Sequence, residues 1–549
     1  MLNKKSLFFC TFLSLITLFF LLLGCANIQR PNGGPKDVTP PRLLKALPSN
    51  MSRNFKAKII QLDFDEYFKL VNQYSEITMS PTQDKPPEYK VKSKSLIVVL
   101  KDTLQKNTTY VINFGKAIAD VNEGNILKNF TYVFSTGPHI DSLSVSGTVT
   151  NTITQKKEKD VTVMLFPIEK DSLYFGKKKP AIFTSTDTAG NFSINNLHDG
   201  DYRIYALEEK TPAPDRIYNK DDELIAFQKQ PVHLYADTSG IQLNLFKEEP
   251  SKFHLAVRKF DMDGKMFFVF NKRLNNPSVK IIYPPALNDQ KIVEFSPTKD
   301  TANIYMKNMD FDSIRVAFFD NNKPLDSASL IKGRKEAFTK NYVFRLNISN
   351  TNKLKPTSDL MLIASYPIAS YDQSQVTLYE DSVAVNNLNI IKDTTNLKRY
   401  IIKYKWKQDS RYIFVADEGA FTFVNGDKNK KYQKQFLVDK IENYSTLTLK
   451  VTVPDTSKQY LVEVYQNPDH IIQTDIITKN TSIIYRNFLT GKYSFKVVYD
   501  DNHNGKWDSG DVKLKRYPEN IWVDPIQITL RPNWDAEEKL DIPKEQVLP

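Results

Sequence analysis

Short runs of alternating apolar and polar residues recur along this sequence, and they restrict the chain to a β-sheet fold. Three early examples are residues 58–64, 95–100 and 109–114. Alternation with a period of two places successive side chains on opposite faces of a strand, and polar turn residues separate the runs. Aromatic residues make up 12% of the chain, and strands favour aromatic and β-branched residues. We therefore expect an all-β protein.

The length of the chain predicts several domains, because 549 residues are too many for one hydrophobic core. Four or five tandem β-sandwiches are the simplest arrangement. The chain contains two cysteines, Cys10 and Cys25, both near the N-terminus. The remaining residues therefore form no disulfide, and we expect packed sheets alone to hold the sandwiches together.

Residues 40–137 carry an ordered set of short motifs. They are Pro40-Pro41, Leu47-Pro48-Ser49, Thr109-Tyr110, Ala119-Asp120-x-x-x-Gly124-Asn125 and Phe134-Ser135-Thr136. In order and spacing they resemble the bacterial Ig-like domain of the SbsA type. The resemblance implies an Ig-like sandwich at 42–138.

Part of this pattern returns later in the chain. Tyr412, Gly426 and Phe436 repeat the spacing of Tyr110, Gly124 and Phe134, so that the Tyr–Gly interval and the Tyr–Phe interval are the same in both copies. This repeat predicts a second Ig-like sandwich at 350–437. Alternation without an identifying motif predicts a further Ig-like sandwich at 250–345.

A different motif is also duplicated. The segment from Asn196 through Gly200 to Tyr202 matches the segment from Asn487 through Gly491 to Tyr493 position by position. With the upstream Asp187-x-x-Gly190-x-Phe192, the first copy resembles the prealbumin-like or carboxypeptidase-regulatory module. The resemblance implies prealbumin-like sandwiches at 141–248 and 438–535, with a C-terminal tail at 536–549. The glycines would form a tight turn and the tyrosines would fill the core.

The first 25 residues have the plan of a secretory signal. Lys4 and Lys5 precede an apolar run at 7–23, which ends in Leu22-Leu23-Gly24-Cys25. This ending resembles the lipobox of a Bacteroidota-type outer-membrane lipoprotein. It implies a signal peptide at 1–24, lipidation (including palmitate) of Cys25, and a flexible tether at 25–41. The alternative is an uncleaved transmembrane anchor, because the apolar run approaches spanning length.

The residue after Cys25 bears on the membrane that the anchor would enter. An aspartate there would resemble an inner-membrane retention signal, whereas this chain has Ala26. We therefore expect lipid anchoring in the outer membrane, on either its periplasmic or its cell-surface face.

The sharpest chemical motif lies at 500–511 and resembles a calcium-binding loop. Oxygen ligands occupy positions 1, 3, 5, 9 and 12, Gly505 is at position 6, and a backbone carbonyl is available at position 7. The candidate Ca²⁺ ligands are Asp500, Asn502, Asn504, Lys506 through its carbonyl, Asp508 and Asp511. Position 12 is Asp rather than Glu, and a strand pattern precedes the loop. The alternative is an Asx- and Gly-rich hairpin that needs no metal.

Sequence patterns typical of catalysis are missing. The six histidines stand apart in the sequence, and the chain contains neither His-Glu-x-x-His nor Gly-x-Ser-x-Gly. The net charge is +12, of which Lys4 and Lys5 account for two, and basic residues are mixed with acidic ones throughout. This mixture argues against a nucleic-acid groove. We expect neither an enzyme nor a nucleic-acid-binding protein.

Two functions remain open at this point. The first is a lipid-anchored outer-membrane lipoprotein that acts as a structural or interaction scaffold of the cell envelope, with the membrane and other envelope proteins as partners. The alternative is a carbohydrate- or peptide-binding accessory lipoprotein of an uptake system. Trp507, Trp522 and Trp534 lie near the C-terminus, which makes that end the candidate site for a glycan or peptide ligand.

Overall fold

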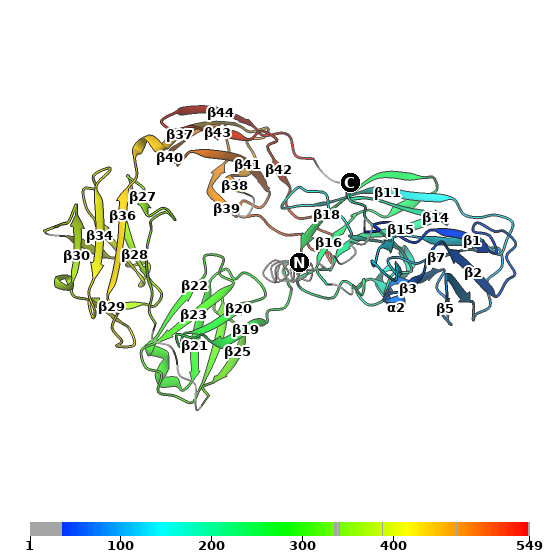
Figure 1. Cartoon of the computed structure of the whole chain (residues 1–549), viewed down its shortest axis with the longest axis horizontal. Helices are drawn as coiled ribbons and strands as arrows, with labels where there is room; N and C mark the ends of the chain where they lie inside the picture. Colours follow the sequence, from blue (N-terminus) through cyan, green and yellow to red (C-terminus); the bar gives the residue numbers. More distant parts are fainter. Residues whose placement is uncertain are drawn as a thin grey trace, which may run out of the picture. The chain divides into compact units, whose positions relative to one another are not determined.

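The computed structural model describes residues 36–211, 214–333, 338, 341–386, 388–467 and 470–546. The predicted signal peptide and Cys25 lie outside these residues. The chain divides into two compact units, Met1–Ile140 and Asp141–Pro549. Both consist of small β-sheets, which Figure 1 shows in chain order from blue to red, and this confirms the predicted all-β fold. Among the described residues, no helix combines the length and apolar character needed to cross a membrane.

Five hydrophobic cores follow one another along the described chain, and each belongs to one β-sandwich. We number the sandwiches 1 to 5 in chain order. Their strands span residues 43–135, 143–247, 255–331, 344–438 and 444–541. Sandwich 1 belongs to the first unit, and sandwiches 2 to 5 belong to the second.

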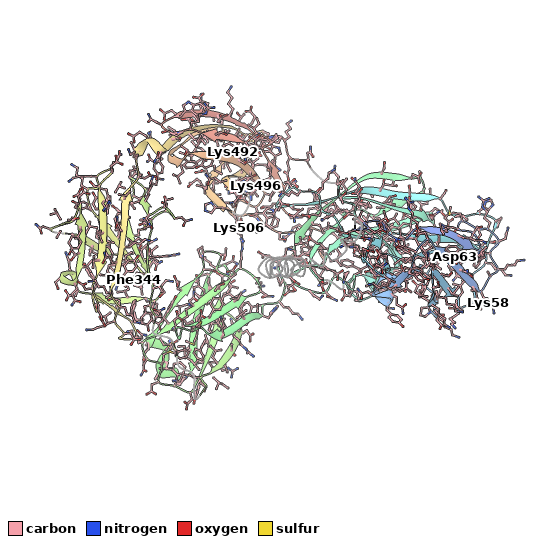
Figure 2. All side chains as sticks on the ribbon, viewed as in Figure 1. Lys58, Asp63, Phe344, Lys492, Lys496 and Lys506 are labelled. Carbon is pink, nitrogen blue, oxygen red and sulfur yellow. The ribbon has the colours of Figure 1, made fainter. Side chains whose placement is uncertain are left out.

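Sandwich 1 consists of three sheets with the strand orders β1-β2-β6-β5, β10-β7-β4 and β3-β8-β9. Apolar residues alternate along β2 and β6, so that Ile60, Leu62, Leu96 and Val98 are buried on one face. Asp63 lies on β2 (Figure 2) and points away from the core, where it accepts a hydrogen bond from Ser95. The strands are β1 (Leu43–Leu47), β2 (Ile59–Phe64), β3 (Phe68–Leu70), β4 (Thr78–Ser80), β5 (Glu88–Lys92), β6 (Ser95–Val99), β7 (Thr109–Asn113), β8 (Ile118–Asp120), β9 (Ile126–Leu127) and β10 (Thr131–Ser135).

Sandwiches 3 and 4 share with sandwich 1 the strand order of its first two sheets, to which sandwich 4 adds further strands. Their orders are β19-β20-β23-β22 with β21-β24-β25, and β26-β28-β33-β32 with β27-β36-β34-β30-β31 and β29-β35. Sandwich 3 consists of β19 (Leu255–Phe260), β20 (Met266–Phe270), β21 (Pro277–Tyr283), β22 (Lys291–Phe295), β23 (Thr301–Met306), β24 (Ser313–Asp320) and β25 (Lys323–Ile331). Sandwich 4 consists of β26 (Phe344–Leu346), β27 (Lys353–Leu354), β28 (Leu360–Ala364), β29 (Ile368–Tyr371), β30 (Val376–Glu380), β31 (Val383–Ala384), β32 (Asn389–Lys392), β33 (Arg399–Lys403), β34 (Arg411–Ala416), β35 (Phe421–Phe423) and β36 (Tyr432–Val438).

The repeated Tyr–Phe spacing corresponds to a repeated contact. Tyr110 stacks on Phe134 with ring centroids 5.4 Å apart, and Tyr412 stacks on Phe436 at 5.5 Å. In both copies the tyrosine hydroxyl accepts a hydrogen bond from the backbone N–H five residues earlier, at 2.8 and 2.9 Å. The buried hydroxyl therefore has a partner, as a buried polar group requires.

Sandwich 4 begins earlier than the predicted residue 350. Phe344 (labelled in Figure 2) lies on β26, which pairs with β28, and its side chain is buried in the core of sandwich 4. Tyr305 of sandwich 3 belongs to the same core, and its ring packs edge-on against Tyr366 at 4.9 Å. The two sandwiches therefore share buried surface.

Sandwiches 2 and 5 each have eight strands in matching positions. The first strand pairs in parallel with the last and antiparallel with the fourth, and the second pairs with the third and fifth, in both copies. Sandwich 2 consists of β11 (Leu143–Asn151), β12 (Thr162–Pro167), β13 (Ile182–Ser185), β14 (Asn191–Leu197), β15 (Gly200–Glu208), β16 (Leu224–Phe227), β17 (Val232–Leu234) and β18 (Thr238–Lys247). Sandwich 5 consists of β37 (Tyr444–Thr452), β38 (Gln459–Asn467), β39 (His470–Ile477), β40 (Thr481–Leu489), β41 (Gly491–Asp500), β42 (Ile521–Val523), β43 (Ile528–Leu530) and β44 (Asp535–Asp541).

The duplicated Asn–Gly–Tyr motif also repeats its geometry. Asn196 and Asn487 both adopt a left-handed backbone conformation, with φ of 57° and 58°, which asparagine tolerates better than most residues. Tyr202 and Tyr493 are buried, and each hydroxyl donates to the carbonyl four residues earlier. The tyrosines therefore fill the cores, as the sequence motif predicts.

The predicted C-terminal tail at 536–549 is wrong over the segment that forms β44. This strand pairs with β37 along seven residues, and Ala536, Leu540 and Ile542 are buried in the core of sandwich 5. In Asp535–Asp541 only Ala536 and Leu540 are buried, and the position between them is Glu538. The charged residues therefore interrupt the alternation of apolar and polar residues that would identify a strand. The duplication implies this strand, since β18 holds the same position in sandwich 2.

We predict that β44 contributes to the cooperative stability of sandwich 5. Leu540 is fully buried, so Leu540→Ala should lower the free energy of unfolding by about 2–5 kcal/mol. The matched control is Lys539→Ala, because Lys539 is exposed on the same strand. Urea unfolding of the full chain measures both variants, and equal stability of the two would contradict the role of β44.

Candidate functional site

The candidate calcium ligands lie at the start of a long connection between β41 and β42, residues 501–520, called the clasp loop below. Asp500 ends β41 and is fully buried. Its carboxylate accepts hydrogen bonds from the backbone N–H groups of Asn504 at 3.1 Å and Gly505 at 2.8 Å. Gly505 has a φ of 76°, a conformation that glycine adopts without strain. Asp500 therefore fixes the first turn of the loop.

Three further candidate ligands converge next to this turn. Asn502 and Asn504 both donate their side-chain amides to one carboxylate oxygen of Asp508. The ammonium group of Lys506, labelled in Figure 2, lies 3.7 Å from the other oxygen of Asp508. The structure thus brings the Asn502, Asn504 and Asp508 side chains together.

Asp511 lies outside this convergence. Its carboxylate accepts a hydrogen bond from the backbone N–H of Leu514 at 2.8 Å, and its backbone forms a bridge with Arg516. Within the described ranges, no group of three or more His, Cys, Asp or Glu side chains is placed to hold a metal ion. The donor set at the turn therefore consists of two carboxylates, two side-chain amides and backbone carbonyls. So few carboxylates fit a weak Ca²⁺ site rather than a tight one.

Glu519 lies against the same loop and was not among the predicted ligands. Its two carboxylate oxygens accept hydrogen bonds from the backbone N–H groups of Asp501 at 3.1 Å and Asp508 at 2.9 Å. Burial, with the neighbouring Asp508 and Asp500 charges, raises the pKa of Glu519 to about 7. No sequence spacing marks this residue, because Glu519 lies near the C-terminal end of the clasp loop and meets Asp501 and Asp508 only when the loop folds back on itself.

The other side of the clasp loop packs on the outer face of sandwich 2. Both segments belong to the second unit. Val512 is buried there, and Trp507 and Tyr517 pack against the same cluster. The sandwich 2 side of the cluster is Met164, Phe166, Phe183, Tyr205, Leu207, Ile225, Phe227 and Phe246. Tyr517 stacks on Phe227 with ring centroids 5.2 Å apart.

Gly510 permits the close approach of the two surfaces. A Cβ atom at this position would lie 2.6 Å from the ring of Phe246, a distance at which the ring or the loop would have to move. Backbone groups complete the contact, because Tyr517 accepts a hydrogen bond from the N–H of Lys229 at 2.7 Å. The N–H of Val512 donates to Glu248 at 2.8 Å.

Lys515 inserts its ammonium group among the aromatic rings of sandwich 2. The group lies 4.5 Å from the ring centroid of Tyr205 and 5.3 Å from that of Phe227. It also donates a hydrogen bond to the hydroxyl of Tyr205 at 2.6 Å. Burial lowers the pKa of Lys515, and the negative faces of the rings offset part of the cost of removing the charge from water.

The comparisons with known proteins concern the fold of the N-terminal unit above all. Residues 37–136 match the family described as Bacterial Ig-like domain. This match confirms the Ig-like domain predicted from the N-terminal motifs, and it covers less than half of the chain. No curated protein matches the sequence.

Solved structures of other multidomain proteins overlap with this chain at low identity. BcpA, the major pilin subunit of Bacillus cereus, is 12% identical, and the overlap covers 73% of this chain and 99% of that one, with a TM-score of 0.14. The Bacillus anthracis TIE protein is 9% identical over 93% and 76% of the two chains, with a TM-score of 0.14. The S-layer protein rSbsC(31-844) is 11% identical over 90% and 68%, also with a TM-score of 0.14. At these values the overlaps carry no argument about function.

We predict that Lys515 and Tyr205 stabilise the docked clasp loop jointly. Lys515→Ala should weaken docking by about 1–2 kcal/mol, because it removes a desolvated cation–π contact and a hydrogen bond. Hydrogen exchange of the Val512 amide measures docking, since its partner Glu248 lies on the opposite surface. Lys513→Ala is the matched control, because Lys513 is exposed in the same loop.

A double-mutant cycle with Tyr205→Phe tests whether the two residues act together. The effects of Lys515→Ala and Tyr205→Phe should be non-additive by about 0.5–1 kcal/mol. Additive effects, or equal exchange rates in Lys515→Ala and Lys513→Ala, would show that this contact does not hold the loop.

Proposed function

We propose that this protein is a non-enzymatic, lipid-anchored outer-membrane lipoprotein that acts as a structural or interaction scaffold of the cell envelope. The observation that carries the proposal is the docking of the clasp loop. It joins sandwich 5 to sandwich 2 through a buried aromatic cluster, although about 300 residues separate the partners. A chain of sandwiches held together in this way suits a scaffold, which must keep its parts in a fixed arrangement under load.

The environments of the histidines support a non-enzymatic role. His198, His233 and His254 are exposed and pair with aspartates of the surface, at 3.3–3.5, 2.7 and 3.6 Å. These pairs are typical of solvated surface residues.

The proposed anchor rests on Leu22-Leu23-Gly24-Cys25 and on the apolar run before it. A lipid on Cys25 would attach the chain to the membrane, and residues 26–41 would act as a tether of up to about 45 Å at roughly 3 Å per residue. Ala26 favours the outer membrane. Other envelope proteins are the proposed partners.

We predict that Cys25→Ser abolishes lipid labelling. The chain expressed with a labelled palmitate precursor should carry the label, and the Cys25→Ser variant should remain an unlabelled, uncleaved precursor. Cys10→Ser is the matched control, because Cys10 lies within the proposed signal peptide and should leave labelling unchanged. Labelling of Cys25→Ser at the level of the control would rule out the proposed anchor.

We also propose that Ca²⁺ binds at the turn of the clasp loop through Asp500, Asn502, Asn504, Asp508 and the carbonyl of Lys506. The convergence of the Asn502, Asn504 and Asp508 side chains beside the turn that Asp500 fixes supports this site. Asp511 lies outside this convergence, where its carboxylate accepts a hydrogen bond from Leu514, and is left out of the proposed set. When bound, the ion would balance the carboxylates and order the turn. The same loop carries the docking residues, so Ca²⁺ would also favour docking.

We predict that Ca²⁺ raises the thermal stability of the full chain. A ligand that binds only the folded state and is present at 100 times its Kd raises the free energy of unfolding by about 2.7 kcal/mol. We expect a Kd for Ca²⁺ in the region of 10⁻⁴–10⁻³ M. Asp508→Asn should remove the increase. Asp501→Asn should keep it, because Asp501 lies next to the site but faces Lys458. Equal melting temperatures in Ca²⁺ and in EGTA would leave the loop as a metal-free turn.

A further inference from the structure

A polar cavity of about 600 Å³ lies between sandwich 2 and sandwich 5, within the second unit. One wall comes from β11 and β18, and the other comes from the end of β41, from β42 and from residues 543–546. The volume is in the range of sites that hold small ligands. This cavity is separate from the aromatic cluster beneath the clasp loop, with which it shares no lining residue.

The sandwich 2 wall presents an ordered array of hydroxyl and amide groups. In the parallel pairing of β11 with β18, Thr148 lies beside Gln242, and Thr150 lies beside Asn244. The residues between them, Val149 and Leu243, are buried in the core, so the four polar side chains share the outer face. All four line the cavity. Each of these groups can accept hydrogen bonds, and each can also donate.

The opposite wall adds an aromatic ring. Trp522 on β42 lines the cavity and is half-buried, with part of its ring packed against the core of sandwich 5. The adjoining segment is held in place by two hydrogen bonds, from the Tyr499 hydroxyl to the carbonyl of Pro543 at 2.9 Å and from the Asn520 amide to Glu545. These bonds hold residues 543–545 against the end of β41 and the residue that precedes β42, next to the Trp522 ring.

The charge of the lining restricts the ligand. Among the described residues that line the cavity none carries a carboxylate, and the charged members are Lys157 and Lys544, both exposed. A cationic ligand would meet no counter-charge in this cavity. A polyhydroxylated ligand, neutral or acidic, would match the hydroxyl, amide and ammonium groups.

Thr152 provides an independent indication that the cavity wall has unused hydrogen-bonding capacity. Thr152 lines the cavity and is 3% exposed. Its hydroxyl oxygen is buried and has no hydrogen-bond partner among the described residues. A buried hydroxyl that stays unpaired is unfavourable, and a polar ligand in the cavity could pair it if the side chain rotates.

We propose that this cavity binds a short oligosaccharide, with Trp522 against a sugar face and the β11–β18 side chains on its hydroxyl groups. The hydroxyl and amide array and the Trp522 ring favour a sugar over a peptide as the ligand. β18 pairs with β16 only at Phe246 and Lys247, so a peptide that adds a strand beside Gln242 and Asn244 is the competing ligand, and the test below includes one. The inference does not depend on the lipid anchor or on Ca²⁺.

Isothermal titration of the detergent-solubilised full chain tests the proposal. The probes are maltotetraose, cellotetraose, chitotetraose and mannotetraose as neutral sugars, tetragalacturonate as an acidic sugar, and tetra-alanine as a peptide. We expect saturable binding of at least one sugar, in EGTA as well as in Ca²⁺. A comparison of the neutral sugars with tetragalacturonate shows whether Lys157 and Lys544 contribute to binding.

Variants assign the binding to the cavity. Trp522→Ala should weaken binding about tenfold or more, which corresponds to 1.4 kcal/mol, and Gln242→Ala with Asn244→Ala should weaken it as well. Trp534→Ala is the matched control, because Trp534 is 46% exposed on the same sandwich outside the cavity. Thr152→Val should weaken binding without lowering the stability of the free chain. Absence of sugar binding at about 10 mM, binding that neither cavity variant affects, or binding of tetra-alanine alone would overturn the proposal.

Discussion

The packing of the clasp loop on sandwich 2 is the interaction on which the arrangement of residues 141–549 depends. Lys515 and Tyr205 are 310 residues apart in sequence. Joining two points of a flexible chain of that length costs about 5 kcal/mol in closure entropy, and folded sandwiches in between reduce this figure. The cation–π contact of Lys515 alone would not offset it. Val512 is buried and Trp507 and Tyr517 are partly buried against sandwich 2. At about 1.5–3 kcal/mol for a fully buried side chain and less for a partly buried one, their burial is the larger part of the compensation.

Sequence patterns predicted the parts of the fold that depend on contacts within one sandwich, between neighbouring strands or nearby residues. The Tyr110–Phe134 and Tyr412–Phe436 stacks lie on neighbouring strands of one sheet, so their spacing follows from strand length and can be read from the chain. The buried tyrosines Tyr202 and Tyr493 of sandwiches 2 and 5 also form local contacts, four residues back along the chain. Strand β44 escaped prediction because its inward residues are small or separated by charges, although the duplication implied it.

The candidate site was predictable only in part, for a physical reason. The turn around Asp500, Asn504 and Gly505 is formed by hydrogen bonds within a few residues, and its residues occur together in the sequence. Glu519 and the docking surface are brought in by tertiary structure. Nothing in the order of residues near 515 indicates an aromatic surface near 205, and a lysine among polar neighbours is typical of an exposed loop.

Sandwiches 2 and 5 diverge at the positions where docking occurs, and this explains why sandwich 2 receives the loop. In sandwich 2, Met164 pairs across the sheet with Tyr205, and both side chains belong to the apolar outer face. At the equivalent position of sandwich 5, Lys496 (labelled in Figure 2) pairs with Glu463, and the two form an ion pair at 2.6 Å. The two side chains are already mostly buried, at 11% and 13% exposure, so this position offers a clasp loop a charged pair in place of the apolar surface that Met164 and Tyr205 provide. The apolar face of one copy and the ion pair of the other therefore define which sandwich gives the loop and which receives it.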